Sequence, residues 1–257
     1  MNTEQLAHRI ERELIERSDH ALSLITHDLK SPLVAIMGFT GLLRRGIEKQ
    51  PHNPEWLTML RRMESAGESM MRLIEDLMFM ARAEAGHEPL EPVWVESLDA
   101  ELADIVSTFQ LEASARRIAL SLDARGPLPP ARWDMRRLRY HAINNVISNA
   151  LKFTPEEGMV TVQAKAEGET IALRVIDNGP GIPLSERGRI FQRFERATSS
   201  SARVAKGSGL GLYNASLVVT RHGGEIFIED TPDGGGACVC LRLPRDPGLI
   251  TEGCVRA

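Results

Sequence analysis

The chain has 257 residues, of which 42% are hydrophobic and 26% are charged, and its formal net charge is −4 at pH 7. This length suffices for one large domain or two ordinary ones with buried cores, and the composition is typical of globular proteins. There is no basic tail or arm for nucleic acid, no apolar stretch of membrane-spanning length, and a start too charged for a signal peptide. We expect a cytoplasmic protein with no nucleic-acid partner and no membrane span in this chain.

Cysteine usage agrees with that compartment. The three cysteines are Cys238, Cys240 and Cys254, an odd number without a CxxC pair. Two of them stand two positions apart on a predicted strand, where they share a face but are poorly placed to bond each other. This pattern indicates reduced thiols and argues against a metal site.

Two long segments near the N-terminus have apolar or small residues alternating three and four positions apart. The first seam is Ile15, Ser18, Leu22, Ile25, Leu29, Pro32, Ile36, Phe39 and Leu43, and the second is Trp56, Leu60, Met63, Gly67, Met70, Ile74, Leu77 and Ala81. A polar turn at 46–54 separates them. The spacing predicts an antiparallel helical hairpin, and a dimer would bury both stripes in a four-helix bundle.

His27 lies on the first of these helices, on the face opposite the seam. If Leu22 and Ile25 are the a and d positions, His27 is at f and points into water. A lone exposed histidine on a helix is ordinarily a solvated side chain. Its significance therefore depends on motifs that lie more than a hundred residues downstream.

A glycine- and proline-containing segment, 85–94, is predicted to link the hairpin (1–84) to a second domain (95–246), which precedes a tail (247–257). Helices are expected at 98–115, 135–153 and 208–221, and strands at 118–122, 160–166, 171–176, 225–229 and 237–243. The alternation predicts an α/β sandwich with helices on one face of a mixed sheet.

Asn145 and Asn149 stand one helical turn apart on the same face and are followed by Lys152. Amide oxygens in this arrangement can coordinate Mg²⁺, and the lysine can meet phosphate. Helix asparagines are also found at caps or in solvent. Here they flank apolar residues in mid-helix, where asparagine has poor helix propensity and needs a partner.

Asp177 ends a predicted strand and is followed by Gly179 and Gly181. A carboxylate in this place can accept a hydrogen bond from the adenine amino group, and the glycines allow close backbone approach. The same pattern on its own is compatible with a simple turn.

Glycines at 207, 209 and 211 open a predicted helix whose backbone donors and dipole favour phosphate. The pattern fits neither the Rossmann fingerprint nor a Walker A loop. The preceding stretch is rich in serine and basic residues and is predicted to form a mobile lid, with Arg196, Arg203 and Lys206 as candidates to neutralise phosphate charge.

Taken in order, five segments resemble the H, N, G1, F and G2 boxes of sensor histidine kinases. They are HDLKSPL (27–33), NNVISNALKFT (144–154), DNGPGIP (177–183), IFQRF (190–194) and GSGLGL (207–212). The resemblance spans about 22–244. It implies a dimerisation and histidine-phosphotransfer hairpin, followed by the α/β sandwich ATP-binding domain of the Bergerat fold shared with gyrase and heat-shock chaperones.

The resemblance also implies roles for individual residues. His27 would accept the γ-phosphoryl group of ATP, and Asp28 would orient or deprotonate it. Asn145 and Asn149 would carry Mg²⁺, and Asp177 would bind adenine. The remaining nucleotide contacts would come from Lys152, Phe153, Gly179, Gly181, Ile182, Arg196, Arg203, Lys206, Gly207, Gly209, Leu210 and Gly211.

The implied partners are a second copy of the chain and the receiver domain of a response regulator, with a sensor input that is separate or missing. Two positions depart from the family pattern. Ser31 replaces a common threonine assigned to water placement in response-regulator dephosphorylation, which puts phosphatase activity in doubt. Ala237 replaces a threonine after Gly236, and loss of that hydroxyl would weaken adenine binding by about 0.5–1.5 kcal/mol.

Two other classes remain open. One is a signalling adaptor with a degenerate nucleotide site, against which Asn149, Asp177 and the lid glycines argue. The other is an ATPase of the gyrase and chaperone type, which the resemblance associates with a glutamate at position 145. Asparagine cannot act as a base on water, so hydrolysis alone is less favoured.

Overall fold

The computed structural model describes residues 29–30, 32–43, 45–47, 55–87, 89–195, 208–231 and 235–249. The predicted site residues outside these ranges are His27, Asp28, Ser31, Arg196, Arg203, Lys206 and Gly207. The chain forms two compact units, Met1–Met78 and Phe79–Ala257. The first contains the helical hairpin and the second contains the sheet.

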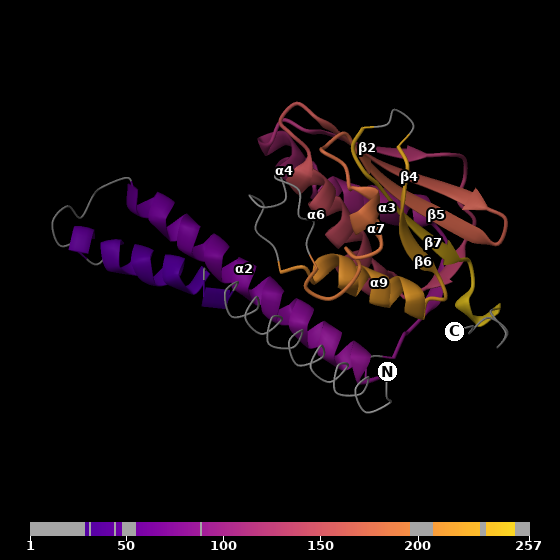
Figure 1. Cartoon of the computed structure of the whole chain (residues 1–257), viewed down its shortest axis with the longest axis horizontal. Helices are drawn as coiled ribbons and strands as arrows, with labels where there is room; N and C mark the ends of the chain where they lie inside the picture. The colour runs from indigo at the N-terminus through magenta and orange to yellow at the C-terminus, as the bar shows by residue number, and fades with distance from the viewer. Residues whose placement is uncertain are drawn as a thin grey trace, which may run out of the picture. The chain divides into compact units, whose positions relative to one another are not determined.

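The two helices of the first unit run antiparallel. Their described residues are 29–30, 32–43 and 45–47 of the first helix and α2 (Glu55–Glu84), drawn in indigo and violet in Figure 1. The guanidinium carbon of Arg62 lies 5.7 Å from the ring centroid of Phe39. Closer to the turn, a Cβ on Gly46 would lie 1.8 Å from the ring of Trp56. Late residues of the first helix thus face early residues of α2, which confirms the predicted hairpin.

Part of the apolar surface of α2 stays exposed. The exposed apolar side chains are those of Leu57, Leu60, Met71, Ile74 and Met78. They follow a three- and four-residue spacing that continues through Glu64 and Gly67, whereas Trp56, Met63 and Met70 are half-buried. The predicted seam therefore divides into one side that faces the first helix and another that has no described cover. No helix among the described residues has the length and apolarity that crossing a membrane requires.

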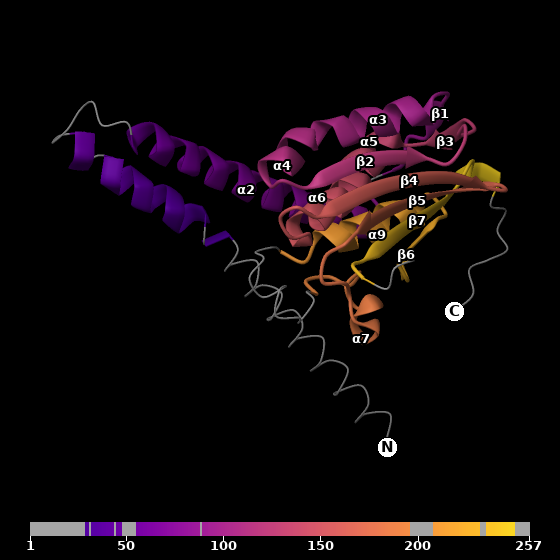
Figure 2. The same ribbon diagram turned by 90° about the horizontal axis from the view of Figure 1, so that it is seen from above.

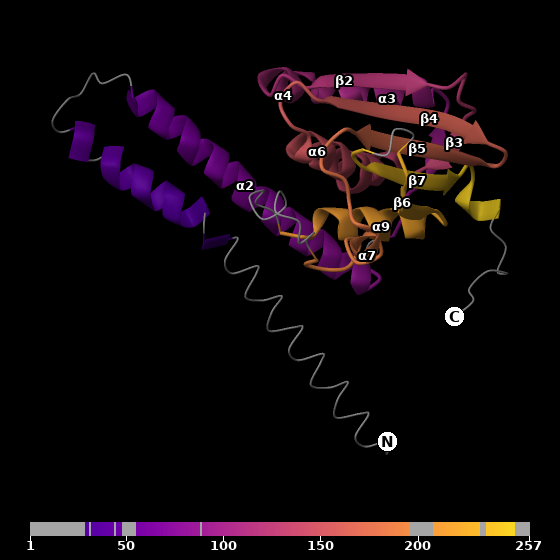
Figure 3. The same ribbon diagram turned by 45° about the horizontal axis from the view of Figure 1, so that its top comes forward.

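The second unit is built on a five-stranded mixed sheet (Figures 1 and 3). Its strands, in spatial order, are β2 (Ala119–Ala124), β4 (Met159–Glu167), β5 (Thr170–Asp177), β7 (Cys238–Pro244) and β6 (Glu225–Glu229). Only β2 and β4 pair in parallel, and the other neighbours are antiparallel. Figure 2 shows the helices gathered on one face, α3 (Leu98–Thr108), α6 (Asn144–Phe153) and α9 (Gly211–Arg221). The predicted α/β sandwich is confirmed.

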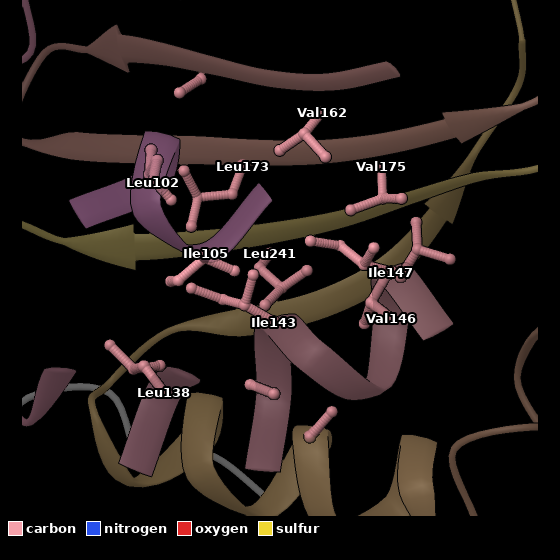
Figure 4. Packing of buried hydrophobic residues seen from close by; sticks show 14 of the residues in the cluster. Leu102, Ile105, Leu138, Ile143, Val146, Ile147, Val162, Leu173, Val175 and Leu241 are labelled. Carbon is pink, nitrogen blue, oxygen red and sulfur yellow. The ribbon is translucent and has the colours of Figure 1, made fainter. Parts of the chain in front are cut away.

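The core lies between this sheet and its helices. Alternate strand residues such as Val162, Leu173 and Val175 are buried toward the helices, where they meet Ile105 and Ile147 (Figure 4). Period-two alternation in the strands and period-3.6 spacing in the helices supply one apolar face each. The site residues are therefore attached to well-packed elements.

The helix predicted at 135–153 exists but is not uniformly α-helical. It consists of α5 (Met135–Arg137), the π-helical turn η1 (Leu138–Ile143) and α6. The side chain of Asp134 caps its start by accepting a hydrogen bond from the backbone N–H of Arg137 at 3.1 Å. A π turn shifts the following residues around the helix axis, and such turns are frequent at functional sites. This turn immediately precedes the paired asparagines.

Short elements differ from the prediction. Phe109 divides the helix expected at 98–115 into α3 and α4 (Gln110–Ala115). The predicted linker 85–94 ends in β1 (Val93–Val95), which pairs with β3 (Ala131–Trp133). The helices α7 (Leu184–Arg187) and η2 (Pro247–Leu249) are further elements that the spacing did not predict.

Cys238 and Cys240 are buried free thiols on β7. Burial raises the pKa of Cys238 to about 11 and the pKa of Cys240 to about 12. Both therefore stay protonated at neutral pH.

Candidate nucleotide site

Asp177 ends β5 as a fixed hydrogen-bond acceptor. Its Oδ1 accepts hydrogen bonds from the backbone N–H groups of Gly179 at 2.8 Å and Ala237 at 3.2 Å. Among the described residues these are the hydrogen bonds of this side chain, so Oδ2 has no protein donor there. Burial raises the pKa of Asp177, and the two backbone donors offset part of that rise. The second carboxylate oxygen is available to a ligand.

The backbone around Asp177 is packed too tightly for side chains. Gly236 has φ 78°, and a Cβ on it would lie 1.8 Å from the backbone oxygen of Asp177. Gly181 packs against the carbonyl oxygen of Gly236, and a Cβ on Gly179 would lie 2.9 Å from Oδ1 of Asp177. Gly179 and Gly181 are thus brought together with Gly236, which the resemblance marked only as the residue before Ala237. A run of three glycines before a predicted strand was the available signal for Gly236.

Ala237 also takes part through its backbone. The sequence singled it out because it lacks a threonine hydroxyl, yet its N–H is the group that donates to Asp177. Any residue except proline supplies this donor. The hydrogen bond that positions Asp177 is therefore independent of the side chain at 237.

Asn145 and Asn149 lie on α6, and their side chains are in different situations. The Nδ2 of Asn145 donates to the backbone oxygens of His141 at 2.9 Å and Gly211 at 3.1 Å. Both amide donors are thereby used, and Oδ1 remains for a ligand. The Asn149 side chain is half-buried, and no described residue forms a hydrogen bond with it. Two amide oxygens on adjacent turns are thus available as ligands.

Lys152, Phe153 and Ile182 lie on segments that border Asp177. Lys152 and Phe153 are the last two residues of α6, and Nζ of Lys152 lies 5.1 Å from the ring centroid of Phe153. The backbone oxygen of Phe153 packs against Gly179. Ile182 is half-buried in the loop after β5, and its carbonyl accepts a hydrogen bond from Arg187 Nε at 3.2 Å.

The predicted lid has well-defined roots at its two ends. Before it, Phe194 adopts φ 61°, and after it, Gly209 adopts φ 70°. A Cβ on Gly209 would lie 2.7 Å from the backbone carbon of Phe194, so the two roots are in direct backbone contact. Leu210 is fully buried and Gly211 begins α9 beside Asn145. Of the predicted lid glycines, Gly211 therefore lies beside Asn145, and Gly209 lies beside Phe194.

The described residues hold no group of three or more His, Cys, Asp or Glu side chains that could bind a metal ion. A hard cation at this site would instead meet amide and phosphate oxygens, which suits Mg²⁺. The orientation of Asn145 fits this because its nitrogen is committed to two carbonyls. The residues present are therefore compatible with a magnesium ion that arrives with a nucleotide.

The fold and this constellation define a class of protein. Residues 134–247 match the family model of the histidine kinase-, DNA gyrase B- and HSP90-like ATPases. Residues 18–86 match the His Kinase A (phospho-acceptor) domain. The second unit is thus an ATP-binding domain, and the hairpin is a phospho-acceptor domain that includes His27.

Two curated proteins resemble the chain across most of its length. The chain is 33% identical over 222 residues to the phosphate regulon sensor protein PhoR of Pseudomonas aeruginosa, covering 86% of this chain and 48% of PhoR. It is 37% identical over 231 residues to the signal transduction histidine-protein kinase AfsQ2 of Streptomyces coelicolor, covering 87% of this chain and 41% of AfsQ2. The chain belongs to the sensor histidine kinases of two-component systems. It spans less than half the length of either relative.

Solved structures agree on the fold. Full-length ShkA in complex with AMPPNP matches with a TM-score of 0.63 and 25% identity, over 88% of this chain and 45% of that one. The histidine kinase ThkA in complex with the response regulator protein TrrA matches with a TM-score of 0.64 and 19% identity, over 96% of this chain and 69% of that one.

Proposed function

We propose that this chain is a protein histidine kinase that phosphorylates its own His27 with ATP and passes the phosphoryl group to an aspartate of a response regulator. The observation that carries the proposal is one arrangement. The second unit holds Asp177, which can accept a hydrogen bond from adenine, two amide oxygens on α6, and two contacting segments on either side of the predicted lid. The same chain also contains a phospho-acceptor hairpin.

Adenine is selected by the available oxygen of Asp177. The 6-amino group of adenine donates a hydrogen bond, whereas guanine presents a carbonyl oxygen at the same edge. A carboxylate accepts from the first and repels the second. Gly179 and Gly181 leave room for the base, and Phe153 and Ile182 would pack beside it.

The phosphates would be held by charge and by backbone donors. Lys152, Arg196, Arg203 and Lys206 would neutralise them, and the glycines at 207, 209 and 211 with Leu210 would carry the lid across them. Asn145 and Asn149 would hold Mg²⁺, which supplies charge neutralisation when bound. Asparagine at 145 in place of a carboxylate leaves no general base for water on that turn, which favours transfer over hydrolysis.

In the transfer step, a ring nitrogen of neutral His27 attacks the γ-phosphorus and forms a P–N bond. The bond from that phosphorus to the bridging oxygen breaks, and ADP leaves with the electron pair. Asp28 accepts the imidazole proton. In the second step a receiver aspartate oxygen attacks the phosphorus and forms an acyl phosphate. The P–N bond breaks, and the leaving imidazole takes back a proton from Asp28, so that neutral His27 is regenerated. Ser31 would place water if the chain also removes phosphate from its response regulator.

The stripe of exposed apolar side chains on α2 supports a homodimer. Burying it against a second copy would complete a four-helix bundle. The proposed partner follows from the predicted position of His27. At an outward-facing f position, His27 would be accessible to a receiver domain after phosphorylation. The ThkA complex with TrrA is an example of such a partner for a protein of this fold.

Radiolabelled ATP tests the proposal. With γ-³²P-ATP and Mg²⁺, the wild-type chain is expected to gain an acid-labile, base-stable label that His27→Ala loses while its ATP affinity is unchanged. Release of free phosphate without labelled protein would favour the ATPase class. If neither labelled protein nor free phosphate forms, the adaptor class would be favoured. If a histidine is still labelled in His27→Ala, His27 is not the residue that accepts the phosphoryl group.

A further inference from the structure

The last turns of α2, from Phe79 to Glu84, are packed against the nucleotide-binding unit and belong to it. Phe79 is 1% exposed and stacks on His141 with ring centroids 3.7 Å apart and an angle of 11° between the planes. Ala83 is buried, and its carbonyl accepts a hydrogen bond from Arg221 of α9. These last turns of α2 are therefore packed into the second unit.

Glu84 makes two further contacts, one to each end of the lid. Tyr213 Oη donates to Oε1 at 2.5 Å, and Arg193 Nη1 donates to Oε2 at 3.2 Å. Arg193 precedes the segment 196–207, and Tyr213 lies in the first turn of α9 after it. One carboxylate thus bridges the two roots of the lid.

The segments that contain Arg193 and Tyr213 are packed against each other. The backbone of Phe194 and Glu195 packs against Gly209, and Arg189 pairs with both carboxylate oxygens of Glu195. Glu84 therefore bridges two residues whose segments are already in contact. The Tyr213 hydroxyl remains a donor at neutral pH because burial and Glu84 raise its pKa to about 12.

A second connection leads from the same helix end to the paired asparagines. Phe79 packs on His141, and the backbone oxygen of His141 accepts the hydrogen bond that orients Asn145. His141 lies in the π turn η1, where the backbone is shifted relative to an α-helix. Both sides of the proposed phosphate site are thus in contact with α2.

From these contacts we propose that Glu84 is a positioning residue for nucleotide binding, which acts by holding Tyr213 at the start of α9 and Arg193 after α7. The proposal rests on the proposed function, because it takes the site around Asp177 and the paired asparagines of α6 as the ATP site. Coupling of this kind is reciprocal. A contact that favours nucleotide binding must itself be strengthened when the nucleotide binds.

Two measurements on the full chain test the coupling. The first is the affinity for Mg²⁺ and AMPPNP by titration calorimetry, in the wild type and in Glu84→Gln, Tyr213→Phe and the double variant. Each single change is expected to weaken binding 3- to 10-fold, and the double change to weaken it by less than the product of the two. The second is hydrogen exchange of the amides at 79–87, which AMPPNP is expected to slow in the wild type and not in Tyr213→Phe.

The matched controls are Glu68→Gln and Tyr140→Phe. Glu68 is an exposed glutamate of the same helix that pairs with Arg72, and Tyr140 is an exposed tyrosine of the same unit. Both controls are expected to bind AMPPNP like the wild type. Equal affinity in Glu84→Gln, Tyr213→Phe and the wild type, with AMPPNP leaving exchange at 79–87 unchanged, would overturn the proposal.

The two proposals fail in different ways. If the wild type gains no label on His27 while the Glu84 and Tyr213 variants still weaken AMPPNP binding, the phosphotransfer is wrong and the coupling stands. If His27 is labelled in the wild type, and the Glu84 and Tyr213 variants match the wild type in AMPPNP affinity and in amide exchange at 79–87, the coupling is wrong and the phosphotransfer stands. A merely structural effect would lower the thermal stability of the variants without changing the response of exchange to AMPPNP.

Discussion

At Asp177 one carboxylate oxygen is held by two backbone donors and the other is left for a ligand. Asp177→Asn is expected to weaken ATP binding about 10- to 100-fold, because a hydrogen bond to a charged group contributes roughly 1.5–3 kcal/mol. Titration calorimetry with AMPPNP measures the loss. Asp123→Asn, which changes a carboxylate on the edge strand β2, serves as the control and should bind normally. Unchanged affinity in Asp177→Asn would remove this residue from the adenine site.

Gly236 is fixed by its backbone conformation and by its neighbour. A Cβ there would meet the backbone oxygen of Asp177 at 1.8 Å in a residue with φ 78°. Gly236→Ala is expected to lower the free energy of unfolding by about 2–4 kcal/mol, because left-handed strain and a backbone clash add. Urea denaturation measures it. The adjacent Gly235 has open space around it, so Gly235→Ala should change stability by less than about 1 kcal/mol.

Among the elements, α9 is joined to the start of α5 by a buried histidine. His222 Nε2 accepts from the backbone N–H of Asp134 at 3.0 Å, and Nδ1 donates to the carbonyl of Val218 at 2.8 Å. Burial lowers the pKa of His222, and the neutral ring with its proton on Nδ1 satisfies both partners. Asp134, beside Arg137, faces the same ring. Burial would raise the pKa of Asp134, but its hydrogen bonds and Arg137 hold it below the ordinary value.

The sign of the pH dependence follows from proton uptake. Below the ordinary histidine pKa of about 6.5 the unfolded chain binds a proton that folded His222 does not, so stability falls as the pH falls below that value. The free energy of unfolding from urea titrations at pH 7.5 and 5.5 is expected to decrease in the wild type and to decrease less in His222→Gln. Equal slopes in the two proteins would contradict the assignment.

The sequence predicted the long elements because their apolar spacing is a local property of each segment. The hairpin helices, the strands of the main sheet and the helix over 135–153 all follow from such spacing. The π turn and the β1–β3 pair do not, because a shifted turn and three-residue strands leave no periodic signal. Elements whose existence depends on contacts far away in the sequence were the ones missed.

The candidate site divides in the same way. Asp177 and Asn145 were predicted because residue type and spacing indicate their chemistry. Gly236 and Ala237 were noted only for a missing threonine hydroxyl, because their backbone contacts with Asp177 depend on the pairing of β5 with β7. The contact of Glu84 with Tyr213 has no sequence signal, since nothing in either segment marks its partner.

For the whole molecule, the two units share one helix, and its two ends have different surroundings. In the first unit α2 packs on the other hairpin helix and keeps an apolar stripe exposed, while its last turns are buried in the second unit. The surface that a second copy would cover therefore lies on the part of α2 in the first unit, and the contacts proposed for nucleotide binding lie on its last turns, in the second unit.

That exposed stripe leads to a prediction about assembly. Leu60 is 45% exposed and Ile74 is 42% exposed, on the same side of α2. Ile74→Glu is expected to shift a wild-type dimer at micromolar concentration toward monomer, raising the dissociation constant at least about 10-fold because an unpaired charge would be buried at the interface. Sedimentation equilibrium measures the change. Thr58→Glu places the same charge on α2 off the stripe and should leave the dimer intact. A wild-type chain that sediments as a monomer at this concentration, or equal dissociation by both variants, would show that the stripe does not hold the dimer.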